Sequence, residues 1–161
     1  MDNALTAISQ DLRFTCYNAL ACSKRDGIME FVAGSTTIQA IKQESTDVPT
    51  FLNSLSDEPE GRKEIMNNYL LSNAGYGVAT YLMAIGDRHL ENLLVKSNGD
   101  LFHLDFGFIL GNNPKKPGTN LIPPIRINKA MVQGMNGPQS DEFKIFKDRT
   151  IDAFLTLRGQ R

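Results

Sequence analysis

The chain has 161 residues, of which 41% are hydrophobic, and its formal net charge is −1. This length and composition allow one domain, or part of one, with a sizeable core. The near-neutral charge excludes a general basic footprint for nucleic acid, so we expect no nucleic-acid partner.

Location and redox chemistry follow from the same composition. No apolar run approaches the roughly 20 residues of a membrane-spanning helix, and the N-terminus lacks the pattern of a secretory signal. We therefore expect a cytoplasmic protein, or one bound peripherally to the cytosolic face of a membrane. Two cysteines, Cys16 and Cys22, are too few for a disulfide framework, and we expect both as small buried apolar residues.

The first third of the chain predicts a helix tail followed by a hairpin. Residues 1–10 carry apolar side chains at helical spacing. Leu12 to Cys22 and Ile28 to Val32 are apolar runs that lie on either side of a predicted turn at Asp26-Gly27. Taken alone, the two runs fit an ordinary hairpin in the core as well as they fit a hairpin with a binding function.

The middle of the chain predicts a surface connection and then a long helix. Ser35 to Thr37 can cap a short helix through Ile41, and the polar residues 43–64, which contain two prolines, are expected to form a loop. Residues 64–85 have a long helical pattern that Gly86 is expected to end. Gly75 and Gly77 lower its helix propensity, so another backbone is expected to pack closely there.

The Asn98-Gly99 pair predicts a second hairpin, because it lies between the apolar runs 93–95 and 101–104. A two-residue turn would place Asn92 opposite Asp105. One amide oxygen and one carboxylate would then converge at the mouth of the hairpin. Hard oxygen ligands of this kind suit Mg²⁺ in nucleotide enzymes, so the pair is a candidate metal clamp.

Two further spacings indicate phosphoryl transfer. Asp87 precedes Asn92 by five positions, which is the separation of the catalytic Asp and the metal-binding Asn in protein kinases. Asp105-Phe106-Gly107 matches the metal-binding tripeptide that follows in those enzymes.

The last part of the chain predicts a loop and a helix. Residues 108–124 are rich in Gly, Asn and Pro and are expected to form a loop. Ser140, followed by Asp141 and Glu142, is expected to start a helix whose aromatic stripe faces the core.

The run from Gly86 to Asn92, Gly-Asp-Arg-His-Leu-Glu-Asn, together with His103 to Gly107, His-Leu-Asp-Phe-Gly, resembles the catalytic segments of phosphatidylinositol 3- and 4-kinases. The residues after Gly107 look like those of a lipid kinase and not of the protein-kinase relatives of this family. Within the family the chain looks most like the class III, vacuolar-sorting phosphatidylinositol 3-kinases, whose pattern the run Pro123 to Met135 closely resembles.

The resemblance implies an α+β fold, the large C-terminal lobe of a protein-kinase-like domain, mostly helical with short antiparallel hairpins that carry the catalytic and metal-binding segments. Residues 1–161 would be a partial catalytic domain without the N-terminal lobe and the last C-terminal helices. The hinge would lie at about 28–34, the catalytic loop at 86–94 and the activation loop at 105–125. Such a chain is expected to have little or no activity alone.

The resemblance also implies the cofactors and the site residues. The cofactors would be ATP and Mg²⁺ (or Mn²⁺). Arg88 is expected to be a structural ion-pair partner. The residues implied as catalytic are Asp87, His89, Asn92 and Asp105, of which Asn92 and Asp105 would hold the metal. Those implied to bind the nucleotide are Tyr17, Met29, Glu30, Phe31, Val32, Leu94 and Leu104. Those implied to meet the lipid head group are Lys115 and Lys116.

The implied activity is transfer of the ATP γ-phosphoryl group to the 3-hydroxyl of phosphatidylinositol, which supports phosphoinositide signalling, endosomal trafficking and autophagy. Implied partners are phosphatidylinositol in endosomal or autophagic membranes, a regulatory protein-kinase-like subunit and a scaffold subunit. Three alternatives stay open: a phosphatidylinositol 4-kinase, a protein kinase of the large related family, and an inactive truncation that acts as a binding module. The sequence does not divide the catalytic roles between Asp87 and His89.

Overall fold

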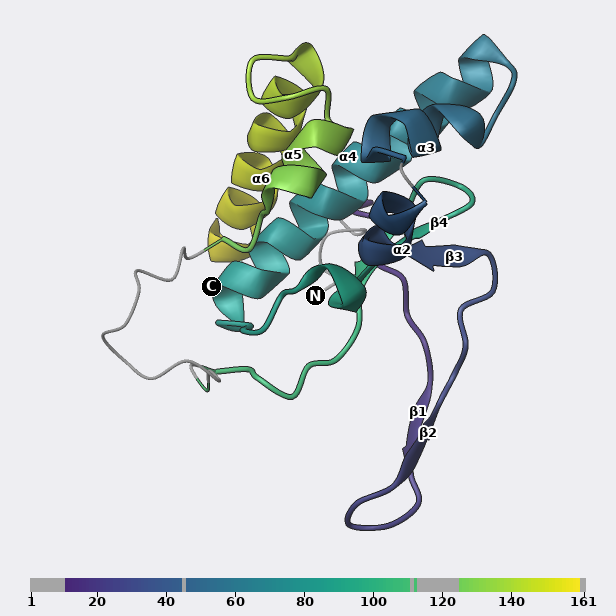
Figure 1. Cartoon of the computed structure of the whole chain (residues 1–161). Helices are drawn as coiled ribbons and strands as arrows, with labels where there is room; N and C mark the ends of the chain where they lie inside the picture. Colours follow the sequence, from purple (N-terminus) through teal and green to yellow (C-terminus); the bar gives the residue numbers. More distant parts are fainter. Residues whose placement is uncertain (1–10, 45, 111, 113–124, 160–161) are drawn as a thin grey trace.

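The computed structural model describes residues 11–44, 46–110, 112 and 125–159 (Figure 1). Within this part of the chain, helices and two small antiparallel sheets form an α+β fold, as expected. The helices are α2 (Ile38–Gln43), α3 (Val48–Ser54), α4 (Pro59–Leu82), α5 (Lys129–Gly134) and α6 (Asp141–Gly159), with a 3₁₀ turn at Leu90–Asn92. The strands are β1 (Ala19–Ala21), β2 (Gly27–Met29), β3 (Ser35–Thr37), β4 (Leu93–Lys96) and β5 (Leu101–His103).

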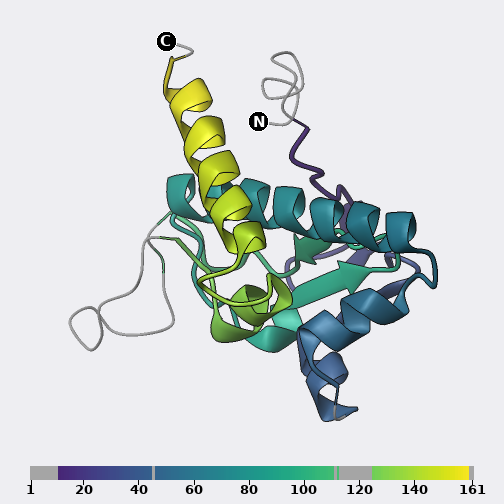
Figure 2. The same cartoon turned by 90° about the horizontal axis from the view of Figure 1, so that it is seen from above.

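Helix α4 runs through the middle of the molecule. Helix α6 crosses it on one side, and strand β5 lies against it within the three-stranded sheet β3-β4-β5 (Figure 2). From Asn68 to Thr80 every residue of α4 except Leu71 is buried. A helix buried on all its faces belongs to the core of a domain, and α4 is the element against which the others pack.

The hairpin β4–β5 forms as predicted, but its register differs by one residue. Leu94 pairs with Phe102, and the Lys96 amide donates to the Asp100 carbonyl at 2.9 Å. The loop therefore has three residues, with Gly99 in the left-handed region at φ 89°, the usual geometry of a three-residue hairpin loop. The predicted pairing of Asn92 with Asp105 was wrong: Asn92 lies opposite Leu104, whose amide donates to the Asn92 carbonyl at 2.9 Å.

Residues 43–64 are not the surface loop that was expected. They contain α3 and the start of α4, and the two prolines lie in the first turns of these helices. A proline in the first turn costs no hydrogen bond of the helix, because the first helical amides have no intrahelical partner. The Asp47 side chain caps α3 by accepting from the Thr50 amide at 2.9 Å. Helix α4 ends at Leu82, before the predicted stop at Gly86.

The first hairpin is confirmed, with Leu20 paired to Ile28, but it is not part of the core. Every residue of β1 and β2 is exposed, and the hairpin projects from the body of the protein (Figure 1). Its turn spans residues 22–26, and Gly27 already belongs to β2. Cys16 and Cys22 are both exposed and free, so the expectation that they are buried was wrong.

The predictions for α2 and α6 are confirmed. Thr37 caps α2 by accepting from the Ala40 amide at 3.0 Å. Ser140 accepts from the Phe143 amide at 3.0 Å at the start of α6, and Phe146 is buried against the core. The predicted helix tail at residues 1–10 lies outside the described residues. None of the helices that the structure describes is long and apolar enough to cross a membrane.

The close approach predicted at the two glycines of α4 is confirmed at one of them. A Cβ on Gly75 would lie 2.9 Å from the Leu12 Cβ and 3.0 Å from the Leu12 carbonyl oxygen. A Cβ on Gly77 would meet only side-chain atoms, at ordinary distances of 3.7 Å or more. Gly75 therefore lets the segment before β1 lie directly on α4, whereas Gly77 has no such role.

We predict that Gly75→Ala destabilises the protein by roughly 1 to 3 kcal/mol, because the added methyl group overpacks the contact with Leu12. Urea unfolding followed by circular dichroism measures this change. Gly77→Ala is the matched control in the same helix, and its free energy of unfolding should stay within about 1 kcal/mol of the parent or rise through better helix propensity. Equal effects of the two substitutions would contradict the assigned contact.

Candidate active site

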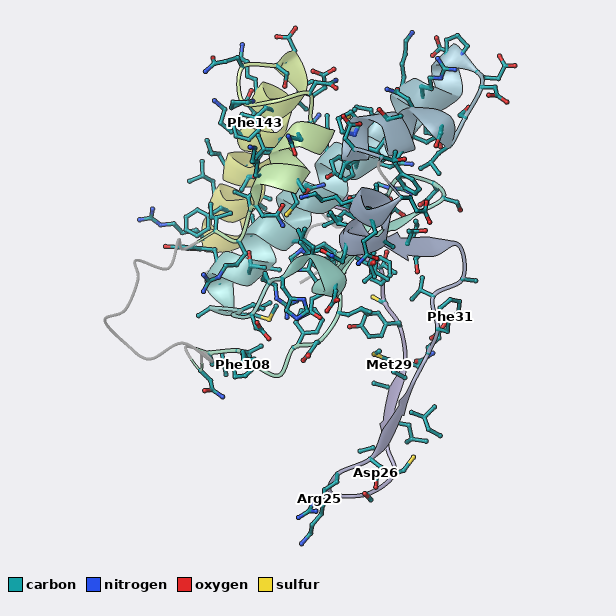
Figure 3. The ribbon with its side chains drawn as sticks, viewed as in Figure 1. Arg25, Asp26, Met29, Phe31, Phe108 and Phe143 are labelled. Atoms are coloured by element: carbon teal, nitrogen blue, oxygen red, sulfur yellow. The ribbon has the colours of Figure 1, made fainter. Side chains whose placement is uncertain are left out.

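The predicted catalytic loop, residues 86–94, is bonded to the segment that follows Asp105-Phe106-Gly107. The Gly86 amide donates to the Phe108 carbonyl, and the Leu110 amide donates to the Met83 carbonyl, both at 2.7 Å. Phe108 lies at the lower edge of the body in Figure 3. These two bonds make the entry to the catalytic loop and the exit from the Asp-Phe-Gly segment neighbours in space.

Asn92 is buried and its side-chain amide points back to Asp87. Its Nδ2 donates to the Asp87 carbonyl at 2.9 Å. No hydrogen bond among the described residues uses the Asn92 Oδ1, which is therefore the free end of the amide. The residue thus fixes the backbone of Asp87 with one end and offers a hard oxygen with the other.

Only one of the two oxygens of the Asp105 carboxylate accepts a hydrogen bond from a described residue. Its Oδ1 accepts from the Gly107 amide at 3.0 Å, and within the described part of the chain Oδ2 has no partner. The residue is exposed and has φ 53°, in the left-handed region. One amide oxygen from Asn92 and one carboxylate oxygen from Asp105 fit the donor set of Mg²⁺, which takes one or two carboxylates and completes its shell with water and phosphate.

Arg88 joins these two segments. Its Nε donates to the Gly86 carbonyl at 2.8 Å, its Nη1 to the Leu104 carbonyl at 2.7 Å, and its Nη2 to the Asp105 carbonyl. The expectation of an ion pair was therefore wrong, since the partners are backbone carbonyls. Burial lowers the pKa of Arg88, while the nearby Asp105 and Asp87 raise it.

His89 and Asp87 differ in exposure. Asp87 is half-buried and has φ 50°, whereas His89 is exposed at the rim with its Nδ1 3.8 Å from Glu91 Oε2. Both residues belong to the short irregular segment 85–89 between α4 and the 3₁₀ turn, and both side chains are at least partly open to solvent.

Among the residues predicted to bind the nucleotide, Tyr17 contacts the strand that leads to Asp105. Its hydroxyl donates to the His103 carbonyl at 3.2 Å, and burial raises its pKa. Leu104 is half-buried, and Leu94 is buried in the centre of the three-stranded sheet. These three predicted residues therefore lie around β5.

The predicted hinge residues form a second group, farther from the catalytic loop. Met29 and Phe31 are exposed and lie on the projecting hairpin (Figure 3). The Glu30 amide donates to the Asn18 carbonyl, and the Val32 carbonyl accepts from Ser35. In the described residues, the Glu30 carbonyl and the Val32 amide have no hydrogen-bond partner. Lys115 and Lys116 lie outside the described residues.

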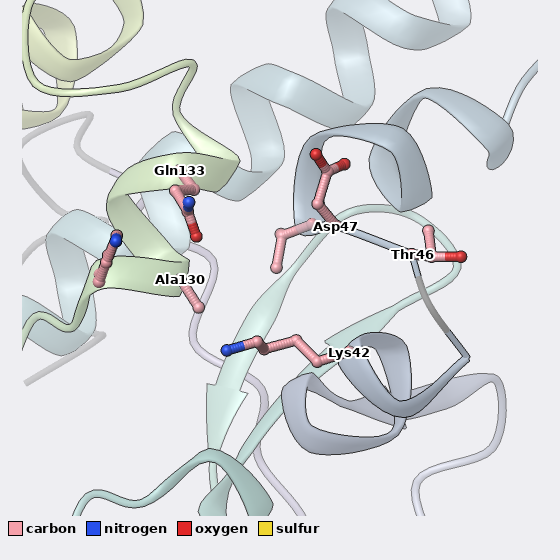
Figure 4. Close-up of a pocket in the computed structure, with 7 residues that line it drawn as sticks. Lys42, Thr46, Asp47, Ala130 and Gln133 are labelled. Atoms are coloured by element: carbon pink, nitrogen blue, oxygen red, sulfur yellow. The ribbon is translucent and has the colours of Figure 1, made fainter.

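A cavity of about 300 Å³ lies apart from this site, between α3 and α5 beside the end of α2 (Figure 4). Lys42 reaches toward it from α2, and Gln133 borders it from α5. It contains none of the predicted site residues. No group of three or more His, Cys, Asp or Glu side chains able to hold a metal was found among the residues placed by the structure.

The sequence did not predict that His103 is buried without a hydrogen-bond partner for its ring. The imidazole is fully buried, stacks on Tyr76 with ring centroids 4.5 Å apart, and has no hydrogen-bond partner at either ring nitrogen. Burial lowers the pKa of His103 to about 3, and the positive charge of Arg88 adds to the effect. The only sequence signal was its place inside the apolar run 101–104.

Comparison with known proteins identifies the family. The model of the family described as phosphatidylinositol 3- and 4-kinase matches residues 47–161. The chain belongs to this family. It is 37% identical to the nodule isoform of phosphatidylinositol 3-kinase from Glycine max and 36% identical to phosphatidylinositol 3-kinase VPS34 from Arabidopsis thaliana, in each case over 98% of this chain and 19% of the relative.

A third relative is the phosphatidylinositol 3-kinase catalytic subunit type 3 of Caenorhabditis elegans, which is 36% identical over 92% of this chain and 17% of its own length. The chain thus spans about a fifth of the length of the curated relatives it matches. The expected resemblance to phosphatidylinositol 3- and 4-kinases is confirmed, including its closeness to the class III enzymes.

We predict that His103 makes the phosphatidylinositol-kinase chain less stable in mild acid. Between pH about 6.5 and about 3 the unfolded chain binds a proton at His103 that the folded chain does not. The free energy of unfolding should therefore fall by about 2 kcal/mol from pH 6.5 to pH 5 through this group. Urea unfolding at several pH values measures the slope.

His103→Phe is the control, because a phenyl ring can stack on Tyr76 but has no titrating nitrogen. The free energy of unfolding of this variant should depend less steeply on pH than that of the parent protein. The assignment is wrong if both proteins show the same slope.

Proposed function

We propose that this chain supplies the nucleotide- and metal-binding part of a phosphatidylinositol 3-kinase, built as the large lobe of a protein-kinase-like domain. The observation that supports it most is the joining of the Asp87 loop to the Asp105 segment by Arg88 and by the Gly86–Phe108 and Met83–Leu110 bonds. The relatives with 36–37% identity all carry the name phosphatidylinositol 3-kinase.

In this proposal the hinge lies at about 28–34, the catalytic loop at 86–94 and the activation loop at 105–125. The relatives are about five times as long as the chain, so we propose that full activity needs more than these 161 residues.

The proposed reaction is transfer of the ATP γ-phosphoryl group to the 3-hydroxyl of phosphatidylinositol. Positioning and charge neutralisation supply most of the catalysis in such transfers. Asn92 Oδ1 and the Asp105 carboxylate would hold Mg²⁺ (or Mn²⁺), which neutralises phosphate charge when bound. Asp87 and His89 share the tasks of receiving the hydroxyl proton and facing the transferred group.

The proposed adenine site uses the two free backbone groups of the hinge. The Glu30 carbonyl and the Val32 amide offer one acceptor and one donor, and both lack partners among the described residues. Apolar walls would come from Met29, Phe31, Tyr17, Leu94 and Leu104, which line the hinge and strand β5.

The proposed lipid side includes Lys115 and Lys116 in the activation loop, where each basic residue near an anionic membrane contributes about 1 kcal/mol. The protein would act on phosphatidylinositol as a peripheral protein of endosomal or autophagic membranes, in the cytoplasm. A regulatory protein-kinase-like subunit and a scaffold subunit are proposed as further partners, in keeping with the description of one relative as a catalytic subunit.

We predict that Asp105→Asn lowers formation of 3-phosphorylated lipid by about a hundredfold or more, because it removes the only carboxylate proposed to hold the metal. The protein expressed from its complete coding sequence is incubated with ATP, Mg²⁺ and phosphatidylinositol vesicles, and the product is separated by head-group position.

Asp148→Asn, on the exposed face of α6, is the matched control and should leave product formation unchanged. A 4-phosphorylated product would replace the 3-kinase assignment with a 4-kinase. Absence of any lipid product in a folded protein that binds Mg²⁺ and ATP would overturn the lipid-kinase proposal and favour a binding module.

A further inference from the structure

Asp87 and Asp105 share an unusual backbone conformation. Both have a left-handed φ, 50° and 53°, although neither is glycine. Such conformations cost of order 1 kcal/mol or more and persist only where the surroundings determine them. Arg88 is bonded beside both, because it holds the carbonyl of Gly86 before Asp87 and the carbonyl of Asp105 itself.

We propose that Arg88 is a positioning residue for the divalent cation: by bonding the carbonyls of Gly86, Leu104 and Asp105, it holds Asp105 in the backbone conformation from which its carboxylate can act together with Asn92. This inference rests on the proposed role of Asn92 and Asp105 in holding the metal. It goes beyond that role, because the Arg88 side chain bonds backbone carbonyls and neither of the two side chains proposed to hold the metal.

The hydrogen bonds of the sheet do not by themselves hold Asp105 in this backbone conformation. The ladder places Leu104 opposite Asn92, and its last bond, from the Leu104 amide to the Asn92 carbonyl, ends one residue before Asp105. The backbone of Asp105 itself is held by the hydrogen bond that Arg88 Nη2 donates to its carbonyl. Phe106 is also held, because the Arg88 guanidinium lies over its ring at 5.5 Å from the centroid.

The geometry requires arginine in particular. The three carbonyls belong to two separate segments, and a planar guanidinium with five donors in a fixed fork can reach all of them at once. A lysine ammonium keeps the charge but is a single flexible donor group. Arg88→Lys therefore separates the loss of positioning from the loss of positive charge beside Asp87 and Asp105.

The test measures metal binding and needs no turnover. Mn²⁺ is titrated into the protein expressed from its complete coding sequence, in the presence of a non-hydrolysable ATP analogue, and free Mn²⁺ is followed by electron paramagnetic resonance. We expect the Kd for Mn²⁺ to rise tenfold or more in Arg88→Lys and in Arg88→Gln. Affinity for the analogue without metal should stay within about twofold.

Arg126→Lys is the matched control. Arg126 is also half-buried and donates to a neighbouring carbonyl, that of Ile85 at 2.7 Å, which is the only carbonyl that its side chain bonds in the described part of the chain. Its substitution should leave the Kd for Mn²⁺ within about twofold. In Arg88→Ala, added guanidinium ion should restore part of the lost Mn²⁺ affinity, which a general loss of stability would not allow.

The outcomes separate this inference from the proposed function. An unchanged Mn²⁺ affinity in Arg88→Lys overturns the positioning role even if the parent protein phosphorylates lipid. A tenfold loss supports the role even if no lipid product forms, in which case the proposed function fails alone. Loss of cooperative unfolding in all three Arg88 variants overturns the inference in favour of a purely structural role.

Discussion

Helix α4 is buried on almost every side from Asn68 to Thr80, so the polar groups along it must find partners within the protein. Three of them find these partners on the backbones of separate elements. Asn68 donates to the Asn98 carbonyl in the hairpin loop, Ser72 accepts from the Leu101 amide, and Thr80 accepts from the Arg126 amide. Each of these bonds fixes one neighbouring segment against the helix, and the bonds of Asn68 and Ser72 hold the β4–β5 hairpin, including the start of strand β5.

The position of strand β5 in turn determines the site. Tyr76 of α4 stacks on His103, and its hydroxyl donates to the Thr15 carbonyl at 3.3 Å. Tyr17, two residues after Thr15, donates to the His103 carbonyl. Strand β5 is thus held at His103 by Tyr76 from helix α4 and by Tyr17 from the segment before β1, and Arg88 bonds the two residues that follow the strand, Leu104 and Asp105.

Much of this could be predicted from sequence where the signal is local. Ser140 and Thr37 are caps with short side chains that bond an amide three residues on, and the order of Asp87, Asn92 and Asp105 identified the family. The register of β4–β5 could not be obtained in this way. Asn98-Gly99 favours a two-residue turn in isolation, but Gly99 lies against the Ile65 carbonyl of α4, so a tertiary contact selects the three-residue loop.

The helix α3 and the role of Arg88 were missed for related reasons. The prolines of residues 43–64 were interpreted as loop residues, although the same residues also start helices, and only the burial of Val48 and Leu52 decides between the two. Arg88 was expected to pair with a carboxylate, but carbonyls carry no sequence signal. Its three partners depend on how the chain folds, and so does the burial of His103.

The projecting hairpin β1–β2 has a consequence for how the protein opens. A two-stranded hairpin is marginally stable by itself, and in the described residues its side chains are exposed, Leu20 and Ile28 by about two thirds. We therefore expect its amide hydrogens to exchange with solvent through local openings far smaller than global unfolding. The proposed hinge and the proposed catalytic loop then belong to different cooperative units, so the backbone groups proposed to bind adenine can rearrange while the Asn92 and Asp105 segments stay folded.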